Sequence, residues 1–300
     1  MADERVRTAV ADVYGGWFSE TASMDDLRAG YDACMPTPPD SVETWTAAFG
    51  GVSGLAGSPK NVTTAGMLLY LHGGGYRIGS SRSHADLAAR LSSAAEVTFF
   101  LPDYRLAPEH PYPAALDDAL SAYRGVVDQV GEKEPVYLAG DSAGGSLTLS
   151  LLLALRDAGD RLPDRVAVLS PKTDFTHTGH SFWARKELDP INSPEMSTEN
   201  ALAYVGDHDP SDPLISPLFG ELAGLPPLLV TVGTSEILFD DSVRLVDRAV
   251  AAGVDARLSI HDGMVHVFQM LTATLPEAQP AIEEIGRFLR DGHDVDHAGR

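Results

Sequence analysis

The sequence is poor in cysteine and in basic residues. Its 300 residues include a single cysteine, Cys34, so no disulfide can form within the chain and no cysteine-based zinc site is expected. We expect no catalytic role for Cys34, because no candidate base lies near it to activate the thiol. Lysine and arginine number 22 against 43 aspartate and glutamate residues, a formal net charge of −21. Such acidity argues against nucleic acid and anionic membrane surfaces as partners, since both require a basic patch.

Long apolar runs are also missing. The longest, around Leu147 to Leu155, is interrupted by Thr148 and Ser150 and is too short to span a bilayer. The N-terminal residues carry charges of both signs with no apolar stretch after them, unlike a secretory signal. We therefore expect a cytoplasmic protein without a membrane partner. Residues 291–300 hold two histidines among aspartates, which we interpret as a solvated terminus and not as a metal site.

From about Met67 onward, short apolar runs alternate with helical patterns. Continuous apolar runs are typical of parallel strands that are covered on both faces. The predicted strands are residues 67–71, 97–101, 136–139, 166–169, 228–232 and 256–260. The predicted helices are residues 83–94, 113–129, 142–158, 240–252 and 276–290. This alternation predicts an α/β fold with a doubly wound, mostly parallel sheet, in a single domain over residues 1–300.

Two regions depart from the alternation. Residues 1–50 look helical at first and then become rich in proline at 36–39. Residues 173–225 contain prolines, aromatic residues and a weak helical pattern around 197–205. A segment of this length without strand signals is usually a lid or a binding insertion in an α/β enzyme. Its aromatic residues indicate packing, so we expect a lid and not a disordered loop.

Residues Gly140-Asp-Ser-Ala-Gly144 follow one predicted strand and begin the next predicted helix. This is the G-x-S-x-G pattern in the strand–turn–helix setting of a nucleophile elbow. The serine backbone must take a strained conformation there, and side chains two residues away on either side would collide. Ser142 is therefore the expected nucleophile. A phosphate-binding loop is not expected, because Ser146 stands where that motif requires lysine.

A second glycine-rich stretch, His72-Gly-Gly-Gly75, directly follows the predicted strand 67–71. Consecutive glycines let backbone amides approach a ligand without obstruction by side chains. An oxyanion hole requires such amides, so this stretch is expected to supply them.

A serine nucleophile needs a general base, and the base needs a carboxylate that orients it. In folds with this elbow, the acid and then the histidine follow the serine along the chain. We favour His266, because its loop precedes the last predicted helix and can deliver an imidazole to the top of the sheet. His261, directly after a predicted strand, is the alternative. The other downstream histidines, His177, His180 and His208, fall in the expected lid.

Glu236 is the favoured acid. It lies in the loop beyond the carboxyl end of the predicted strand 228–232, where catalytic groups collect in α/β sheets. Asp240 is the alternative. It stands with Asp241 where the next helix begins, and a carboxylate at such a position is commonly a helix cap.

Taken together, these motifs resemble the bacterial hormone-sensitive-lipase-like branch of the α/β-hydrolase superfamily. The matching segments are His72-Gly-Gly-Gly-Tyr76, Asp103-Tyr-Arg-Leu-Ala-Pro-Glu-His-Pro-Tyr-Pro-Ala114, Gly140-Asp-Ser-Ala-Gly-Gly145, Asp212-Pro-Leu-Ile-Ser-Pro217 and Gly263-Met-Val-His-Val-Phe268. The resemblance covers about residues 67–290 and implies an α/β-hydrolase fold and a Ser/acid/His carboxylesterase. It also implies a helical cap formed by about residues 1–45 and 173–225.

The same resemblance assigns roles to residues around the triad. It implies that the backbone amides of Gly74, Gly75 and Ala143 form the oxyanion hole. It also implies that His72, Asp103 and Arg105 support the site without taking part in the chemistry.

Two features depart from the family pattern. Many relatives have aspartate where this chain has Glu236, whose longer side chain can still orient His266. Residues 41–66 also lack the clear pair of edge strands that often precedes the His-Gly-Gly-Gly strand. We expect at most shortened strands around residues 50–57.

We interpret the chain as a serine hydrolase that acts on short-chain acyl or acetyl esters of small molecules through an acyl-enzyme intermediate. Two alternatives stay open: a hydrolase or acyltransferase of an acylated secondary metabolite, and a non-catalytic ligand-binding protein on the same scaffold. No metal or organic cofactor is implied. The resemblance also implies that the protein forms a homodimer.

Overall fold

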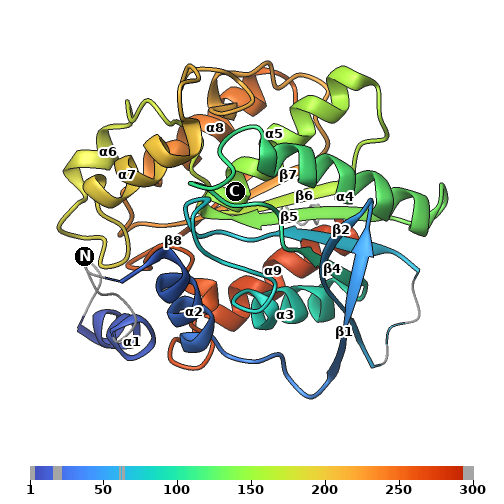
Figure 1. Cartoon of the computed structure of the whole chain (residues 1–300), viewed down its shortest axis with the longest axis horizontal. Helices are drawn as coiled ribbons and strands as arrows, with labels where there is room; N and C mark the ends of the chain where they lie inside the picture. The colour runs from blue at the N-terminus through green and yellow to red at the C-terminus, as the bar shows by residue number, and fades with distance from the viewer. Residues whose placement is uncertain (1–3, 16–21, 61, 63–64, 293–300) are drawn as a thin grey trace, which may run out of the picture.

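In the described part of the chain, eight strands form one sheet in the order β1-β2-β4-β3-β5-β6-β7-β8 (Figure 1). The computed structural model describes residues 4–15, 22–60, 62 and 65–292, so the histidines predicted to lie in a solvated terminus are outside the described residues. The strands are β1 (Val42–Phe49), β2 (Val52–Pro59), β3 (Met67–Leu71), β4 (Thr98–Pro102), β5 (Val136–Asp141), β6 (Arg165–Leu169), β7 (Leu228–Gly233) and β8 (Ala256–His261). Only the pairs β1–β2 and β2–β4 are antiparallel among these strands, which confirms the predicted mostly parallel sheet.

The six strands predicted from apolar runs all lie within two residues of their expected ends. Five of them are almost wholly buried because helices cover both faces of the sheet there, whereas β8 at the edge is only partly buried. In β3 and β5, for example, every residue is buried. A strand covered on both faces needs apolar residues on both sides, which explains why these runs do not alternate with polar residues.

The prediction of shortened edge strands before β3 was wrong. Strands β1 and β2 each contain eight residues and pair along their whole length, from Val42 opposite Pro59 to Phe49 opposite Val52. Most of β1 is solvent-exposed, so it lacks the apolar run by which the other strands were recognised. Gly50 and Gly51 join the two strands with φ values of +57° and +82°, a conformation that glycine adopts without steric cost.

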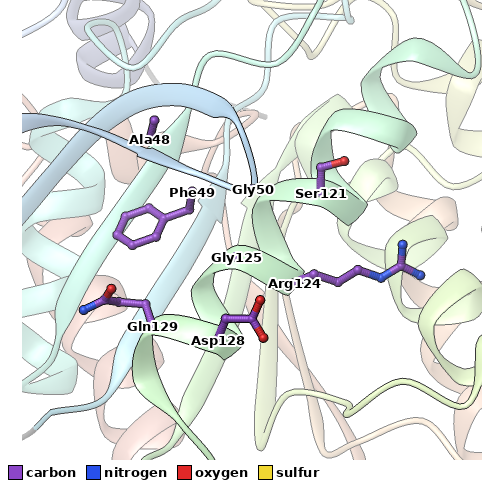
Figure 2. Close-up of a pocket in the computed structure, with 8 residues that line it drawn as sticks. All are labelled: Ala48, Phe49, Gly50, Ser121, Arg124, Gly125, Asp128 and Gln129. Carbon is purple, nitrogen blue, oxygen red and sulfur yellow. The ribbon is translucent and has the colours of Figure 1, made fainter.

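The turn between β1 and β2 lies against helix α4 (Ala114–Val130). A side chain at Gly125 would collide with the backbone of Gly50, and one at Gly50 would collide with the carbonyl of Ser121. A shallow hollow of about 530 Å³ lies beside this contact (Figure 2). Its charged lining residues are Arg124 and Asp128, and Arg124 is already paired with Asp160 at 2.7 Å. It contains no histidine or cysteine.

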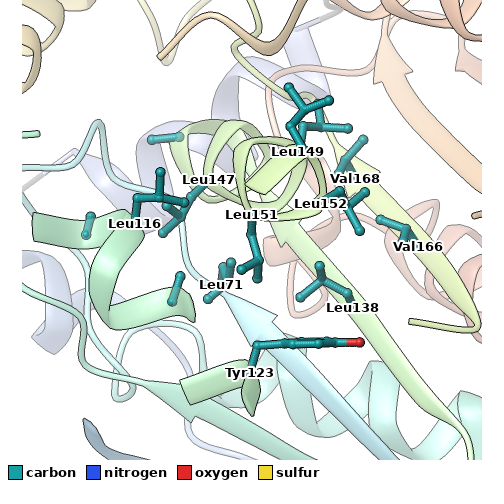
Figure 3. Packing of buried hydrophobic residues seen from close by; sticks show 14 of the residues in the cluster. Leu71, Leu116, Tyr123, Leu138, Leu147, Leu149, Leu151, Leu152, Val166 and Val168 are labelled. Atoms are coloured by element: carbon teal, nitrogen blue, oxygen red, sulfur yellow. The ribbon is translucent and has the colours of Figure 1, made fainter. Parts of the chain in front are cut away.

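Two layers of helices sandwich the sheet. Helices α3 (Ala85–Ala95) and α9 (Ala278–Asp291) pack together on one face. Helices α4, α5 (Ser142–Ala158) and α8 (Phe239–Ala251) cover the other face. Figure 3 shows leucines of α5 between α4 and the strands β3, β5 and β6. Both layers pack against the central strand β5, whose residues are all buried, and the expected nucleophile lies at its end.

Apart from the short 3₁₀ turn η2 (Phe268–Met270), the remaining helices of the described residues come from the two segments that departed from the alternation. They are α1 (Glu4–Tyr14), α2 (Met24–Cys34), α6 (His180–Ala184), α7 (Pro194–Val205) and the short 3₁₀ turn η1 (Pro217–Phe219). In Figure 1, α1, α2, α6 and α7 gather at one end of the molecule. The expected N-terminal cap boundary at about residue 45 lies inside β1, so the helical part of that segment ends before Val42. Among the described residues, no helix is long and apolar enough to cross a membrane.

Candidate active site

Ser142 lies at the junction between β5 and α5 with a φ of +53°. A residue other than glycine rarely adopts this strained conformation. The packing of the strand and the helix around Ser142 holds the backbone in it. A side chain at Gly144 would collide with the carbonyl oxygens of Leu71 and His72. One at Gly140 would collide with the carbonyl of Gly144. The two glycines therefore let α5 start close to β3, which leaves the serine at the tip of a sharp turn.

The structure brings the three expected triad residues together. His266 Nε2 lies 2.8 Å from Ser142 Oγ, and His266 Nδ1 lies 3.0 Å from Glu236 Oε2. A carboxylate oxygen can only accept, so the Nδ1 proton faces Glu236 and Nε2 is left to accept the hydroxyl proton of Ser142. This tautomer is the one that a histidine base requires.

Glu236 is fully buried, and both of its carboxylate oxygens are engaged. Oε1 accepts hydrogen bonds from the hydroxyl of Ser170 at 2.8 Å and from the amide of Gly233 at 2.5 Å. Oε2 is thereby directed toward His266. The extra methylene of glutamate reaches the imidazole from a turn just after β7, so its length does not prevent the contact.

The alternative acid and the alternative base lie elsewhere. Asp240 accepts a hydrogen bond from the amide of Ser181 at 2.9 Å, while its own amide donates to the Ser181 hydroxyl at 2.9 Å. This reciprocal pair ties the start of α8 to α6. His261, at the end of β8, lies 3.3 Å from the Ser259 hydroxyl and 4.0 Å from Glu284. Neither residue lines the cavity around Ser142.

The charge environment favours the protonated form of His266. Burial alone would lower the pKa of His266, but the hydrogen bond and the negative charge of Glu236 outweigh burial and raise this pKa above its ordinary value. Asp189 and Asp141 act in the same direction. An imidazolium that forms during proton transfer is therefore stabilised by carboxylates that are already in place.

Asp189 is a buried carboxylate near the triad that sequence reasoning missed. It lies between α6 and α7 and accepts hydrogen bonds from the amides of Ile191, Asn192 and Ile237 at 2.9–3.0 Å. Ile237 directly follows Glu236, so Asp189 ties the segment before α7 to the turn that carries the expected acid. Burial raises the pKa of Asp189 to about 6.

The glycine-rich loop after β3 faces Ser142 across the cavity. Gly74 and Gly75 have φ values of +109° and +63°, and side chains there would collide with Ile78 and Asn200. Both glycines line the cavity together with Ala143, whose amide lies in the first turn of α5. Amides of a first helical turn have no partner within the helix, so they are available to an anion.

Asp141 holds this loop in place, and the sequence motif alone did not reveal its role. Its carboxylate accepts hydrogen bonds from the amide of Gly73 at 3.0 Å and from the hydroxyl of Tyr70 at 2.7 Å, and lies 3.5 Å from His84. Burial acts to raise the pKa of Asp141, but His84 and the Tyr70 hydrogen bond lower it below the usual value. The residue before the nucleophile thus stays charged and anchors the loop opposite.

Three residues that the resemblance assigned to support lie outside the cavity wall. His72 is buried, its Nδ1 donates to the Gly73 carbonyl at 2.8 Å, and burial lowers the pKa of His72 to about 3. Asp103 accepts two hydrogen bonds from Ser81, and Arg105 pairs with Asp118 at 2.8 Å.

Cys34 is half-buried, and its thiol donates to the carbonyl of Tyr31 at 3.1 Å. Burial raises the pKa of the Cys34 thiol, which disfavours the reactive thiolate. Within the described ranges, no group of three or more His, Cys, Asp or Glu side chains is arranged to hold a metal ion.

The cavity that contains Ser142 and His266 has a volume of about 970 Å³. Its lining comes from α2, from the loops after β3 and β6, from α7 and from the loop that carries His266. Both segments that departed from the strand–helix alternation therefore contribute to its wall. A largely apolar cavity with a few convergent polar groups is typical of a small-molecule site.

Comparison with known proteins agrees with this geometry. Residues 68–270 match the family described as the alpha/beta hydrolase fold. The chain is 42% identical over 289 residues to an acetyl-hydrolase of Streptomyces hygroscopicus, covering 91% of this chain and 92% of the relative. It is 38% identical over 236 residues to a putative acetyl-hydrolase of Mycobacterium tuberculosis, covering 78% and 76%.

A solved structure shares the whole architecture. An esterase from the bacterial hormone-sensitive lipase family superposes with a TM-score of 0.92 at 39% identity, covering 97% of this chain and 99% of that chain. The similarity therefore includes the two segments that line the cavity, in addition to the sheet.

Proposed function

Because the chain belongs to the hormone-sensitive-lipase-like esterases of the α/β-hydrolase fold family and is a carboxylic ester hydrolase, we propose that Ser142, His266 and Glu236 are its catalytic triad. The observation that carries the proposal is the position of the imidazole, 2.8 Å from the serine hydroxyl and 3.0 Å from the buried carboxylate. A base that is hydrogen-bonded to the nucleophile and oriented by an acid is the arrangement that activates a serine.

In the proposed mechanism, His266 Nε2 takes the proton of Ser142 as Oγ attacks the carbonyl carbon of the ester. Negative charge develops on the carbonyl oxygen, where the amides of Gly74, Gly75 and Ala143 stabilise it. The protonated His266 then gives its proton to the leaving alcohol. Water, deprotonated by the same imidazole, hydrolyses the acyl-enzyme and releases the acid.

The proposed substrates are short-chain acyl or acetyl esters of small molecules. The Streptomyces relative is named an acetyl-hydrolase, which supports a small acyl group. Residues of α1, α2 and α7 line the cavity, which supports a cap formed by these helices together with α6 and favours a substrate that the cavity can enclose. A cytoplasmic location and a homodimer stay predictions.

The test replaces Ser142 with alanine. Hydrolysis of p-nitrophenyl acetate and butyrate should fall by about 10⁶-fold in kcat, since the nucleophile itself is lost. The matched control is Ser146→Ala, one turn further along α5, which should keep its activity within a few-fold. Both variants should unfold at the same temperature as the wild-type protein.

A fluorophosphonate probe provides a second readout. It should label the wild-type protein and Ser146→Ala but not Ser142→Ala. Comparable hydrolysis rates in Ser142→Ala and the wild type would refute the proposal. Product analysis with an added alcohol or amine shows whether water is the acceptor of the acyl group.

A further inference from the structure

The cavity around Ser142 has two chemically different sides. On one side, Tyr31, Ile78, Val267 and Met270 belong to a single apolar cluster beneath α2. On the other side, the wall is formed by α7 and by the loop after β6, and it includes Phe175 and Ala201 of the opposite core. An ester bound at Ser142 has two arms, the acyl group and the alcohol group. Because the two sides of the cavity differ, the two arms contact different surroundings.

Lys172 lies in the second wall, directly beside the nucleophile. Its backbone amide donates to the carbonyl of Ser142 at 3.1 Å, and Lys172 is one of the residues that line the cavity. The residue is only 6% exposed, and its ammonium lies 4.8 Å from the centre of the Phe175 ring. A lysine this deeply buried is rare, and the expected triad chemistry does not use it.

The ammonium of Lys172 is held by three hydrogen bonds. It donates to the Ser197 hydroxyl at 2.7 Å, to the Ser197 carbonyl at 3.0 Å and to His177 Nε2 at 2.9 Å. An ammonium has three donors and no acceptor, so all its protons are used and His177 accepts through Nε2. The side chain is thus fixed between α7 and the loop before α6, and it cannot swing out of the wall.

This fixed polar group disfavours the binding of an apolar chain beside it. Burial lowers the pKa of Lys172, and burial is also the main reason that the pKa of His177 is lowered. The Lys172 side chain would remain polar even as a neutral amine. The hydrogen bonds of Lys172 are satisfied within the protein, but an alkyl chain packed against this polar group would keep solvent away from it and offer no polar contact in return. On the α2 side, the same chain would gain apolar contact instead.

We propose that Lys172 is a specificity-determining residue, which makes the wall beside α7 polar and so selects esters whose arm on that side is short or polar over esters with a long alkyl arm there. The inference rests on the proposed function, because it assumes that esters react at Ser142. It narrows the substrate class to esters in which one arm is short or polar. An acetyl group is the smallest acyl arm of this kind.

The test uses two series of esters. One varies the acyl group from acetyl to octanoyl with p-nitrophenol as the constant alcohol, and the other varies the alcohol from ethyl to octyl with a constant acetyl group. The variant is Lys172→Met, which keeps the length of the side chain and removes its polar end. The matched control is Lys186→Met, just after α6, where the lysine is exposed and does not line the cavity.

The readout is the ratio of kcat/KM for the longest ester to that for the shortest. This ratio does not depend on the fraction of folded enzyme, so a merely structural loss leaves it unchanged. Each CH₂ group that gains apolar contact contributes roughly fourfold. We expect the ratio to rise about tenfold or more in one of the two series for Lys172→Met and to stay constant for Lys186→Met.

An unchanged ratio in both series would overturn the inference while leaving the esterase function intact. A wild-type enzyme that prefers the longest ester in both series would overturn it as well, even if Lys172→Met failed to fold. Absence of any hydrolysis by the wild-type protein would instead refute the proposed function. Lys172→Gln, which keeps a polar end, should retain the wild-type ratio, and a rise equal to that of Lys172→Met would show that added space and not polarity is the cause.

Discussion

At the scale of single residues, Glu236 and Asp240 are close in the sequence but have different surroundings in the structure. The carboxylate of Glu236 is fully buried and bonded to His266. That of Asp240 faces the amide of Ser181 at the start of α6. One position suits the orientation of an imidazole, and the other suits the capping of a helix.

This difference predicts opposite outcomes for two conservative substitutions. In Glu236→Gln the side-chain amide would face His266 Nδ1 with a donor and favour the wrong tautomer of the imidazole. We expect kcat to fall by about 10⁴-fold, as it does when the acid of a serine protease triad is neutralised. Asp240→Asn should stay within a few-fold of the wild type. The reverse order, measured with p-nitrophenyl acetate, would assign the acid to Asp240.

The environment of His266 also sets the pH dependence of the reaction. The base must be neutral to accept the serine proton, and the carboxylate of Glu236 raises the pKa of His266 above 6.5, against the effect of burial. A raised pKa means that the histidine loses its proton only at higher pH. The value of kcat/KM should therefore rise with pH and reach half its maximum above pH 6.5.

Acid inactivation must be separated from titration in this measurement. Enzyme that has been held at each pH should regain full activity when it is returned to pH 8. A half-maximum below pH 6.5, for an ester that does not itself ionise, would contradict the assigned environment of His266.

At the scale of elements, the predictable parts are those whose signal is local in the sequence. The elbow was identified because strand β5, Ser142 and helix α5 are consecutive, and the glycines at 140 and 144 report the close approach of the chain. The parallel strands inside the sheet were identified because both of their faces are apolar, and the partly buried edge strand β8 was identified from a weaker apolar run. Their ends were correct within two residues, since the apolar run stops where the strand leaves the sheet.

The edge strands were not predicted in full, and the reason is physical. β1 is exposed along most of its length, so its residues need not be apolar. In β2, side chains at Gly54 and Gly57 would collide with β4 residues 99–102, so small residues occupy positions where β-branched ones usually indicate a strand. Two adjacent glycines between the strands were the one local sign of the hairpin.

The surroundings of the site depend on contacts between distant segments and could not be predicted. Asp141 is held charged by His84 and Tyr70, which lie 57 and 71 residues away along the chain. Lys172 meets Ser197 only after α7 has packed over the cavity. A motif shows that a serine is a nucleophile, but it does not show what the walls of its cavity select.

At the scale of the whole molecule, the excess of acidic residues affects stability more than chemistry. Many ion pairs of the described chain are exposed or join neighbours in sequence, such as Arg290 with Asp291 and Arg156 with Asp157, and such pairs contribute little. A formal net charge of −21 therefore leaves repulsion that these pairs do not cancel. Repulsion of this kind disfavours the compact state.

Salt should relieve this repulsion and stabilise the fold. The Debye length falls from about 30 Å at 0.01 M salt to about 8 Å at 0.15 M, so charges on opposite sides of the molecule cease to interact, while close ion pairs lose less. We expect the melting temperature at neutral pH to rise by a few degrees between these concentrations of sodium chloride. Potassium chloride at equal ionic strength should act alike, because screening does not depend on the identity of the ion. A melting temperature that falls with salt would show instead that the ion pairs outweigh the net repulsion.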